Sequence, residues 1–205
     1  QWGSDEQKKK YLPPMLKADK IWCQLFSEPG CGSDLAAVRT RAERDGDDWI
    51  VNGQKVWTSF AHFADHAILL ARTDPNLPKH KGLSFFVVDM KAAGVEARPI
   101  RQMTGDAEFN EVYLTDVRIK DEDRIGEVGE GWRVAMTVLM HERAGVAGAD
   151  MFGFDGMMAE METLMVDGEP AIENQAVRAQ LADFYVRISG LANTNLRTLS
   201  ALSRG

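Results

Sequence analysis

The hydrophobic period of this 205-residue chain changes at residues 129–131, and this change constrains the fold more than any other feature. Before it, short apolar runs such as residues 67–72 and 83–90 alternate with turn residues, as is typical of strands. After it, apolar residues recur at helical spacing over residues 132–166. The sequence therefore predicts an α+β protein in which a β domain precedes long helices.

Two segments of the β domain carry specific signals. Asn52-Gly53 lies between two strand-like runs, which predicts a hairpin with a type I′ turn. Residues 112–119 alternate apolar and polar with one slip near Asp116, which predicts a strand that bends or bulges. Several short strands with turns between them predict an antiparallel β-barrel or sandwich.

Helices are expected at both ends of the chain. Residues 4–7 form a Ser-x-x-Gln capping box that begins a short helix, and Pro13-Pro14 is expected to end it. Residues 132–166 are largely apolar on every side, which predicts one buried helix that ends at residues 167–170. A second, amphipathic helix is expected from Ile172 onward, with apolar residues at Val177, Leu181, Phe184, Ile188 and Leu191.

Composition excludes several classes of partner. The net charge of −7 argues against binding to a nucleic-acid backbone. The longest apolar runs are far too short to span a bilayer, so no membrane partner is expected. Cys23 and Cys31 lack metal-ligand spacing, and His62 and His66 lack a third ligand, so no metal site is expected. A reducing, cytoplasmic compartment is favoured.

A glycine-rich segment at residues 26–34 (FSEPGCGSD) is the first candidate for ligand binding. Gly30 and Gly32 let backbone N–H groups approach a ligand, and Ser27 and Ser33 add hydroxyls on either side. Such a loop suits a phosphate or a polar ring edge. An ordinary β-turn explains the same residues.

Trp57 and Ser59 are the second candidate, because residues two apart in a strand point to the same face. A flat aromatic surface beside a hydroxyl suits a planar heterocycle with polar edges. A Trp packed in the β core is the alternative.

Glu142 is the third candidate. It lies in the run His141-Glu142-Arg143. The residues that share its helix face are all apolar: Ala135, Val138, Leu139, Val146 and Ala149. A carboxylate in such surroundings is either a candidate proton acceptor or one half of a buried ion pair.

These segments, in this order, resemble the acyl-CoA dehydrogenase family over essentially the whole chain. Residues 24–34 (QLFSEPGCGSD) are similar to its first signature, with Cys where Ala is usual, and residues 52–59 (NGQKVWTS) resemble its second flavin-contacting strand. Residues 116–119 and 129–132 match the exit into the long helix. The resemblance implies the last helix of an N-terminal helical domain (1–19), a β middle domain binding FAD and acyl-CoA (20–122) and two helices of an incomplete C-terminal four-helix bundle (123–205).

The resemblance also implies roles for single residues. Phe26 and Ser27 would border the isoalloxazine ring of FAD, Trp57 would stack on it and Ser59 would lie near its N5 atom. The full set of implied FAD contacts is Gln24, Phe26, Ser27, Gly32, Ser33, Trp57 and Ser59. The implied acyl-CoA contacts are Ser33, Met140, His141 and Arg143.

The implied reaction is α,β-dehydrogenation of an acyl-CoA thioester, in which a carboxylate removes the α-proton and a hydride passes to FAD. Electrons then pass to an electron-transfer flavoprotein. A smaller group of the family, including isovaleryl- and long-chain acyl-CoA dehydrogenases, places the carboxylate immediately before a helix arginine. Glu142 stands there, so we expect it to be the base. Met140 departs from the family, many members of which have Asp.

The family implies a homodimer or homotetramer, and the chain is roughly half of what the family needs, so a fragment is expected. Two alternatives stay open. One is an acyl-CoA oxidase or flavin monooxygenase of the same fold, and the other is a non-catalytic subunit that completes a partner's flavin site.

Overall fold

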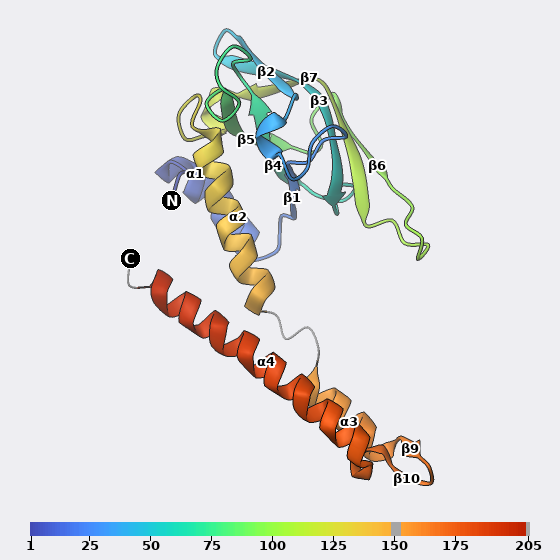
Figure 1. Cartoon of the computed structure of the whole chain (residues 1–205). Helices are drawn as coiled ribbons and strands as arrows, with labels where there is room; N and C mark the ends of the chain where they lie inside the picture. The colour runs from blue at the N-terminus through green and yellow to red at the C-terminus, as the bar shows by residue number, and fades with distance from the viewer. Residues whose placement is uncertain (149–152, 204–205) are drawn as a thin grey trace. The chain divides into compact units, whose positions relative to one another are not determined.

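A computed structural model describes residues 1–148 and 153–203, which form two compact units, Gln1–Thr137 and Val138–Gly205. The first unit contains α1 and one large sheet, and the second contains α3 and α4 (Figure 1). Helix α2 (Gly131–Gly148) begins in the first unit and ends in the second. Strands precede the long helices, which confirms the predicted α+β class.

One eight-stranded sheet dominates the first unit. Its main path is β6 (Val95–Pro99), β7 (Phe109–Lys120), β3 (Asp48–Ser59), β2 (Arg41–Asp45), β4 (His66–Arg72), β5 (Leu83–Asp89) and β8 (Arg124–Ile125). β1 (Trp22–Leu25) pairs with β4 off this path. The β1–β4 and β2–β4 pairs are parallel and the other pairs are antiparallel, so the sheet is mixed. In the described ranges no ladder joins β6 to β8, so the expected barrel is not closed.

The core lies against the apolar face of this sheet. Leu25, Val51, Leu69, Phe86 and Val117 come from five strands, and each is 0% exposed. Burying each such side chain contributes about 1.5–3 kcal/mol to folding. Because β5 and β7 are far apart in the strand order and share this core, the sheet curves around it.

The predicted hairpin at Asn52-Gly53 is wrong, because β3 runs straight through both residues. A Cβ atom on Gly53 would lie 2.4 Å from Oγ1 and 2.7 Å from Cα of Thr40. Gly53 therefore permits close approach of the chain rather than a turn. The turn into β3 comes earlier, where Gly46 has a φ of +61°.

The predicted bulge at Asp116 is confirmed. The β3–β7 register shifts between Val51 and Gly53, and Asp116 has a φ of 51°. The side chain of Asn52 holds the bulge through two hydrogen bonds. Its Nδ2 donates to Oδ1 of Asp116 at 2.9 Å, and its Oδ1 accepts from the Asp116 backbone N–H at 2.8 Å.

Helix α1 (Asp5–Leu16) begins at the predicted capping box. Ser4 Oγ accepts from the Gln7 N–H at 3.1 Å, and Gln7 Oε1 accepts from the Ser4 N–H at 2.9 Å. The helix was expected to end at Pro13-Pro14, but it continues to Leu16. Both prolines lie in its last turns, so only two hydrogen bonds near the end of the helix are lost.

The single helix predicted over residues 132–166 is wrong. α2 ends at Gly148, residues 149–152 lie outside the described residues, and α3 (Phe154–Thr163) begins after Gly153, whose φ is +47°. The predicted break at residues 167–170 is confirmed by a small hairpin of β9 (Met165–Val166) and β10 (Glu169–Pro170).

Helix α4 (Gln175–Leu202) is the predicted second helix of this region. It begins after Asn174, whose side chain accepts from the N–H groups of Ala176 and Val177. Phe184 of α4 lies 6.5 Å from Phe154 of α3, measured between ring centroids. Among the described residues there are also three single 3₁₀ turns: η1 (Leu35–Ala37), η2 (Asp121–Asp123) and η3 (Ala171–Glu173). No helix in the described part of the chain is long and apolar enough to cross a membrane.

Candidate functional site

Strand β1 positions the glycine-rich segment. Gln24 is half-buried and pairs with Ile68 of β4, while Leu25 is fully buried. Phe26 follows with 4% exposure and packs edge-on against Phe85, with ring centroids 5.8 Å apart. These contacts fix where the chain leaves the sheet.

The segment then makes a tight turn, as the alternative explanation of an ordinary β-turn predicted. The N–H of Glu28 donates to the Cys31 carbonyl at 2.8 Å, and the N–H of Cys31 donates to the Glu28 carbonyl at 3.0 Å. Gly30, Gly32 and Ser33 after the start of this turn are exposed. Neither glycine has a positive φ, and a Cβ on either would meet nothing within 4 Å. The packing of the chain does not require glycine here, so the open backbone is available to a ligand.

Glu28 of this turn forms a buried ion pair with Lys55, which was not predicted from the sequence. Lys55 is 0% exposed, and its Nζ donates to Glu28 Oε1 at 2.9 Å, to the Phe26 carbonyl at 3.0 Å and to the Leu70 carbonyl at 2.9 Å. Strand alternation offered a signal, because Lys55 lies four residues after the buried Val51 and so faces the same side.

Two backbone N–H groups act together with Lys55 to keep the carboxylate of Glu28 charged. Burial alone raises the pKa of Glu28, but the Lys55 ammonium and hydrogen bonds from Thr40 and Arg39 outweigh it and hold the pKa below its ordinary value. The backbone N–H groups of Arg39 and Thr40 donate to it at 2.7 and 2.9 Å. Burial lowers the pKa of Lys55, yet three acceptors around its Nζ require three N–H donors and so select the ammonium form.

Trp57 is on the surface and not in the core. Its side chain is 61% exposed, and its φ is 59°, a left-handed conformation that is uncommon for a bulky residue. Ser59 is also exposed, while Thr58 between them is 2% exposed, so exposure alternates over these three residues, although the β3–β7 register shifts between Lys55 and Thr58. The Val56 N–H donates to the Ser27 carbonyl at 2.9 Å, which places the glycine-rich segment beside this strand.

The other predicted site residues lie in the second unit. Met140, His141, Glu142 and Arg143 are exposed residues of α2. The expected apolar surroundings of Glu142 are found only in part. Ala135 is fully buried and Val138 and Leu139 are half-buried, while the side chain of Val146 and all of Ala149 lie outside the described residues. Glu142 was predicted to lie in a buried helix with apolar surroundings, but it is exposed in this chain, so that prediction is wrong here.

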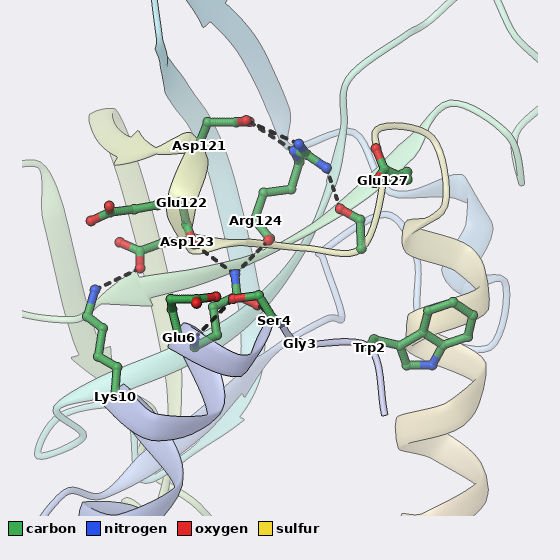
Figure 2. Close-up of a pocket in the computed structure, with 12 residues that line it drawn as sticks. Trp2, Gly3, Ser4, Glu6, Lys10, Asp121, Glu122, Asp123, Arg124 and Glu127 are labelled. Atoms are coloured by element: carbon green, nitrogen blue, oxygen red, sulfur yellow. Dashed lines mark hydrogen bonds and ion pairs between the residues drawn. The ribbon is translucent and has the colours of Figure 1, made fainter.

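A separate pocket of about 540 Å³ lies between the start of α1 and η2–β8 (Figure 2). Its charged groups are largely paired with one another, as in Lys10–Asp123 at 2.9 Å and Arg124–Asp121 at 2.9 Å. Gln7 Nε2 also donates to the carbonyls of Glu122 and Arg124. None of the predicted FAD or acyl-CoA residues lines it, so it adds nothing to the candidate site.

The candidate site therefore combines the exposed ring of Trp57, the hydroxyls of Ser27 and Ser59 and the open backbone at residues 30–32. The curved sheet carries these groups, and long helices follow the sheet in the sequence. Residues 23–117 match the family model "Acyl-CoA dehydrogenase, middle domain", and residues 129–205 match "Acyl-CoA dehydrogenase, C-terminal domain". The chain belongs to the acyl-CoA dehydrogenase family.

Individual relatives agree with this assignment. Acyl-CoA dehydrogenase FadE34 of Mycobacterium tuberculosis is 47% identical over 173 residues, which cover 84% of this chain and 24% of the relative. A solved structure described as the Tcur3481-Tcur3483 steroid ACAD G363A variant has a TM-score of 0.90 and 36% identity, over 100% of this chain and 53% of that chain.

A second solved structure contains a flavin. It is a glutaryl-CoA dehydrogenase from Mycobacterium smegmatis in complex with FADH2, with a TM-score of 0.82 and 29% identity over 96% of this chain. This chain covers 51% of that structure. It thus spans about half the length of these two structures and about a quarter of FadE34.

Proposed function

We infer that this chain supplies the FAD-facing sheet and part of the acyl-CoA cleft of an FAD-dependent acyl-CoA dehydrogenase. The observation that carries the inference is Trp57, a large aromatic side chain held 61% exposed in an unfavourable backbone conformation beside the glycine-rich segment. Such an arrangement costs stability without a ligand, and strained residues of this kind cluster at ligand sites.

The residues present fit FAD. Phe26, Ser27 and Ser59 would border its ring system, and Trp57 would cover one face of the ring. The remaining contacts would come from the half-buried Gln24 and from Gly32 and Ser33. The open backbone at Gly32 and the hydroxyl of Ser33 suit a pyrophosphate, because neither is used by the packing of the described residues.

Bound FAD would accept the hydride from the β-carbon of the acyl-CoA. The residues of the chain would do the rest of the chemistry. Ser33, Met140, His141 and Arg143 would hold the acyl-CoA, and Glu142 would remove the α-proton. Glu142 is an exposed residue of α2 in this chain.

The partners follow from the same assignment. Electrons would leave for an electron-transfer flavoprotein, and the complete protein would form a homodimer or homotetramer. A steroid-derived acyl-CoA is the first substrate class to test, because a structure with 36% identity is described as a steroid ACAD.

The test uses the full-length protein. It should purify with FAD, and anaerobic addition of acyl-CoA thioesters should bleach the flavin absorption. A panel of short, branched and steroid-derived acyl-CoAs would define the substrate class. A protein that is colourless alone, and active only with a partner, would favour the non-catalytic subunit. Oxygen consumption in place of electron transfer to an artificial acceptor would favour an oxidase.

Glu142→Gln tests the base. It should keep FAD but no longer permit bleaching by acyl-CoA, whereas Glu160→Gln, a matched change of an exposed carboxylate in the same unit, should bleach normally. Wild-type bleaching by Glu142→Gln would assign the proton acceptor to another residue.

A further inference from the structure

We propose that the buried ion pair Lys55–Glu28 is a positioning pair that sets the spacing between the two FAD-facing segments, residues 26–28 and 55–59. The proposal rests on the proposed function, and it concerns residues that contact neither the flavin nor the substrate in that function. Both are nearly or fully buried, Lys55 at 0% and Glu28 at 9% exposure.

The hydrogen bonds of Lys55 reach two separate parts of the chain, residues 26–28 and β4. Its Nζ donates to the Phe26 carbonyl at 3.0 Å, to Glu28 Oε1 at 2.9 Å and to the Leu70 carbonyl of β4 at 2.9 Å. An ammonium group has three donors, and all three are used. Lys55 therefore ties the residues on both sides of Ser27 to the middle of the sheet.

The next residue of β3 completes the connection. The Val56 N–H donates to the Ser27 carbonyl at 2.9 Å, so three consecutive residues of the segment are held by two consecutive residues of the strand. Trp57 follows directly. A displacement of residues 26–28 relative to β3 would change the distance between Ser27 and Trp57, the two residues proposed to meet the flavin ring.

Glu28 fixes the far side of the glycine-rich segment. Its Oε2 accepts from the Arg39 N–H at 2.7 Å, and its Oε1 accepts from the Thr40 N–H at 2.9 Å. The chain leaves the sheet before Glu28 and returns to it at Thr40, just before β2. One carboxylate thus closes the loop that contains Gly30, Gly32 and Ser33.

A stabilising role alone does not explain an ion pair here. Desolvating two charges costs about as much as their attraction returns, and apolar residues of similar volume often stabilise a core as well or better. Apolar side chains cannot hold the Phe26 carbonyl or the Arg39 and Thr40 N–H groups in place. The directional bonds of the pair provide the fixed spacing, which prepares the site before FAD binds.

The experiment separates positioning from stability in the full-length protein. Three variants are compared: Lys55→Met, Glu28→Gln and the double variant. Val117→Ala is the matched control, because Val117 is also 0% exposed in this sheet but lies outside both segments. For each protein the melting temperature, the dissociation constant of FAD from the deflavinated protein and the visible circular dichroism of bound FAD are measured.

The double variant decides the question. It should melt above Lys55→Met, because no buried carboxylate is left without its cation, yet bind FAD at least about tenfold more weakly than wild type, with an altered flavin circular dichroism. Val117→Ala should melt below wild type with unchanged FAD affinity and spectrum. If Lys55→Met does not fold, the double variant and Glu28→Gln are compared with this control at matched melting temperature.

Two results would overturn the proposal while leaving the proposed function intact. One is a double variant with wild-type FAD affinity and spectrum. The other is a Val117→Ala control that loses as much FAD affinity as the double variant. A full-length wild-type protein that binds no FAD would refute the proposed function, and this inference with it.

Discussion

Replacing Trp57 with Ala should weaken FAD binding without destabilising the fold. A Trp side chain has an area of up to about 250 Å². With 61% of it exposed, roughly 150 Å² is open to solvent, and a ring stacked on one face would cover about half of that. At about 25 cal/mol per Å², the lost contact is worth about 2 kcal/mol, or roughly a 30-fold rise in the dissociation constant of FAD.

The backbone conformation of Trp57 has a second effect, which concerns the stability of the protein without FAD. Its φ of 59° disfavours any residue with a Cβ, by about 1 kcal/mol or more. Trp57→Gly should therefore be more stable without FAD than Trp57→Ala, although both lose the same stacking surface. The free energy of unfolding of the deflavinated protein would be measured in urea, and FAD affinity by fluorescence titration.

Trp49 provides the control for this pair of variants. It is 5% exposed, and its Nε1 donates to Asp121 at 2.7 Å, so Trp49→Phe should destabilise the protein and leave FAD affinity unchanged. The reasoning fails if Trp57→Ala costs several kcal/mol of stability while FAD binds as tightly as in wild type. That result would make Trp57 a structural residue.

Three further predictions concern the fold. Gly131→Ala should cost about 1–3 kcal/mol in urea unfolding, because its Cβ would lie 2.5 Å from the backbone C of Ser84. Asn52→Ala should cost about 1 kcal/mol by the same measurement, because it removes the hydrogen bonds at the Asp116 bulge; an unchanged midpoint would show that the bulge holds itself. The pKa of Glu28 is lower in the folded state than its ordinary value of 4.5. The charged Glu28 therefore stabilises the fold fully above pH 4.5, and this stabilisation is lost as the pH falls from 4.5 through the lower pKa of the folded state. Unfolding followed from pH 7 to pH 3 should thus show a steeper loss in wild type than in Glu28→Gln, and parallel curves would contradict the assignment.

Features set by neighbouring residues could be predicted from the sequence. The capping box at Ser4 and the strands over residues 67–72 and 83–90 depend on side chains within a few positions of one another. The bulge at Asp116 shows in the local slip of the alternation, although Asn52 of β3 holds it in the structure. Trp57, Thr58 and Ser59 are exposed, buried and exposed in turn, as the two-residue repeat of a strand predicts.

Features set by distant residues could not be predicted. Gly53 looked like a turn residue, because nothing nearby in the sequence shows that Thr40 lies against it. The ion pair of Lys55 could not be predicted, because its partners Glu28 and Leu70 come from other strands and loops. The exposure of Trp57 needed the structure too, since a strand Trp suits a core and a ligand site equally well.

The parallel pairing of β1 with β4 has a consequence for the order in which the protein folds. β4 and β5 are consecutive antiparallel strands joined by the loop between Arg72 and Leu83. β1 pairs with β4 across the much longer stretch from Leu25 to His66, so this pairing costs more loop-closure entropy. The glycine-rich segment directly follows β1, so we expect it to adopt its final position after the β4–β5 hairpin has formed. In pulsed hydrogen exchange during refolding, amides of the β4–β5 hairpin should gain protection before those that β1 contributes to its pairing with β4, and simultaneous protection would argue against this order.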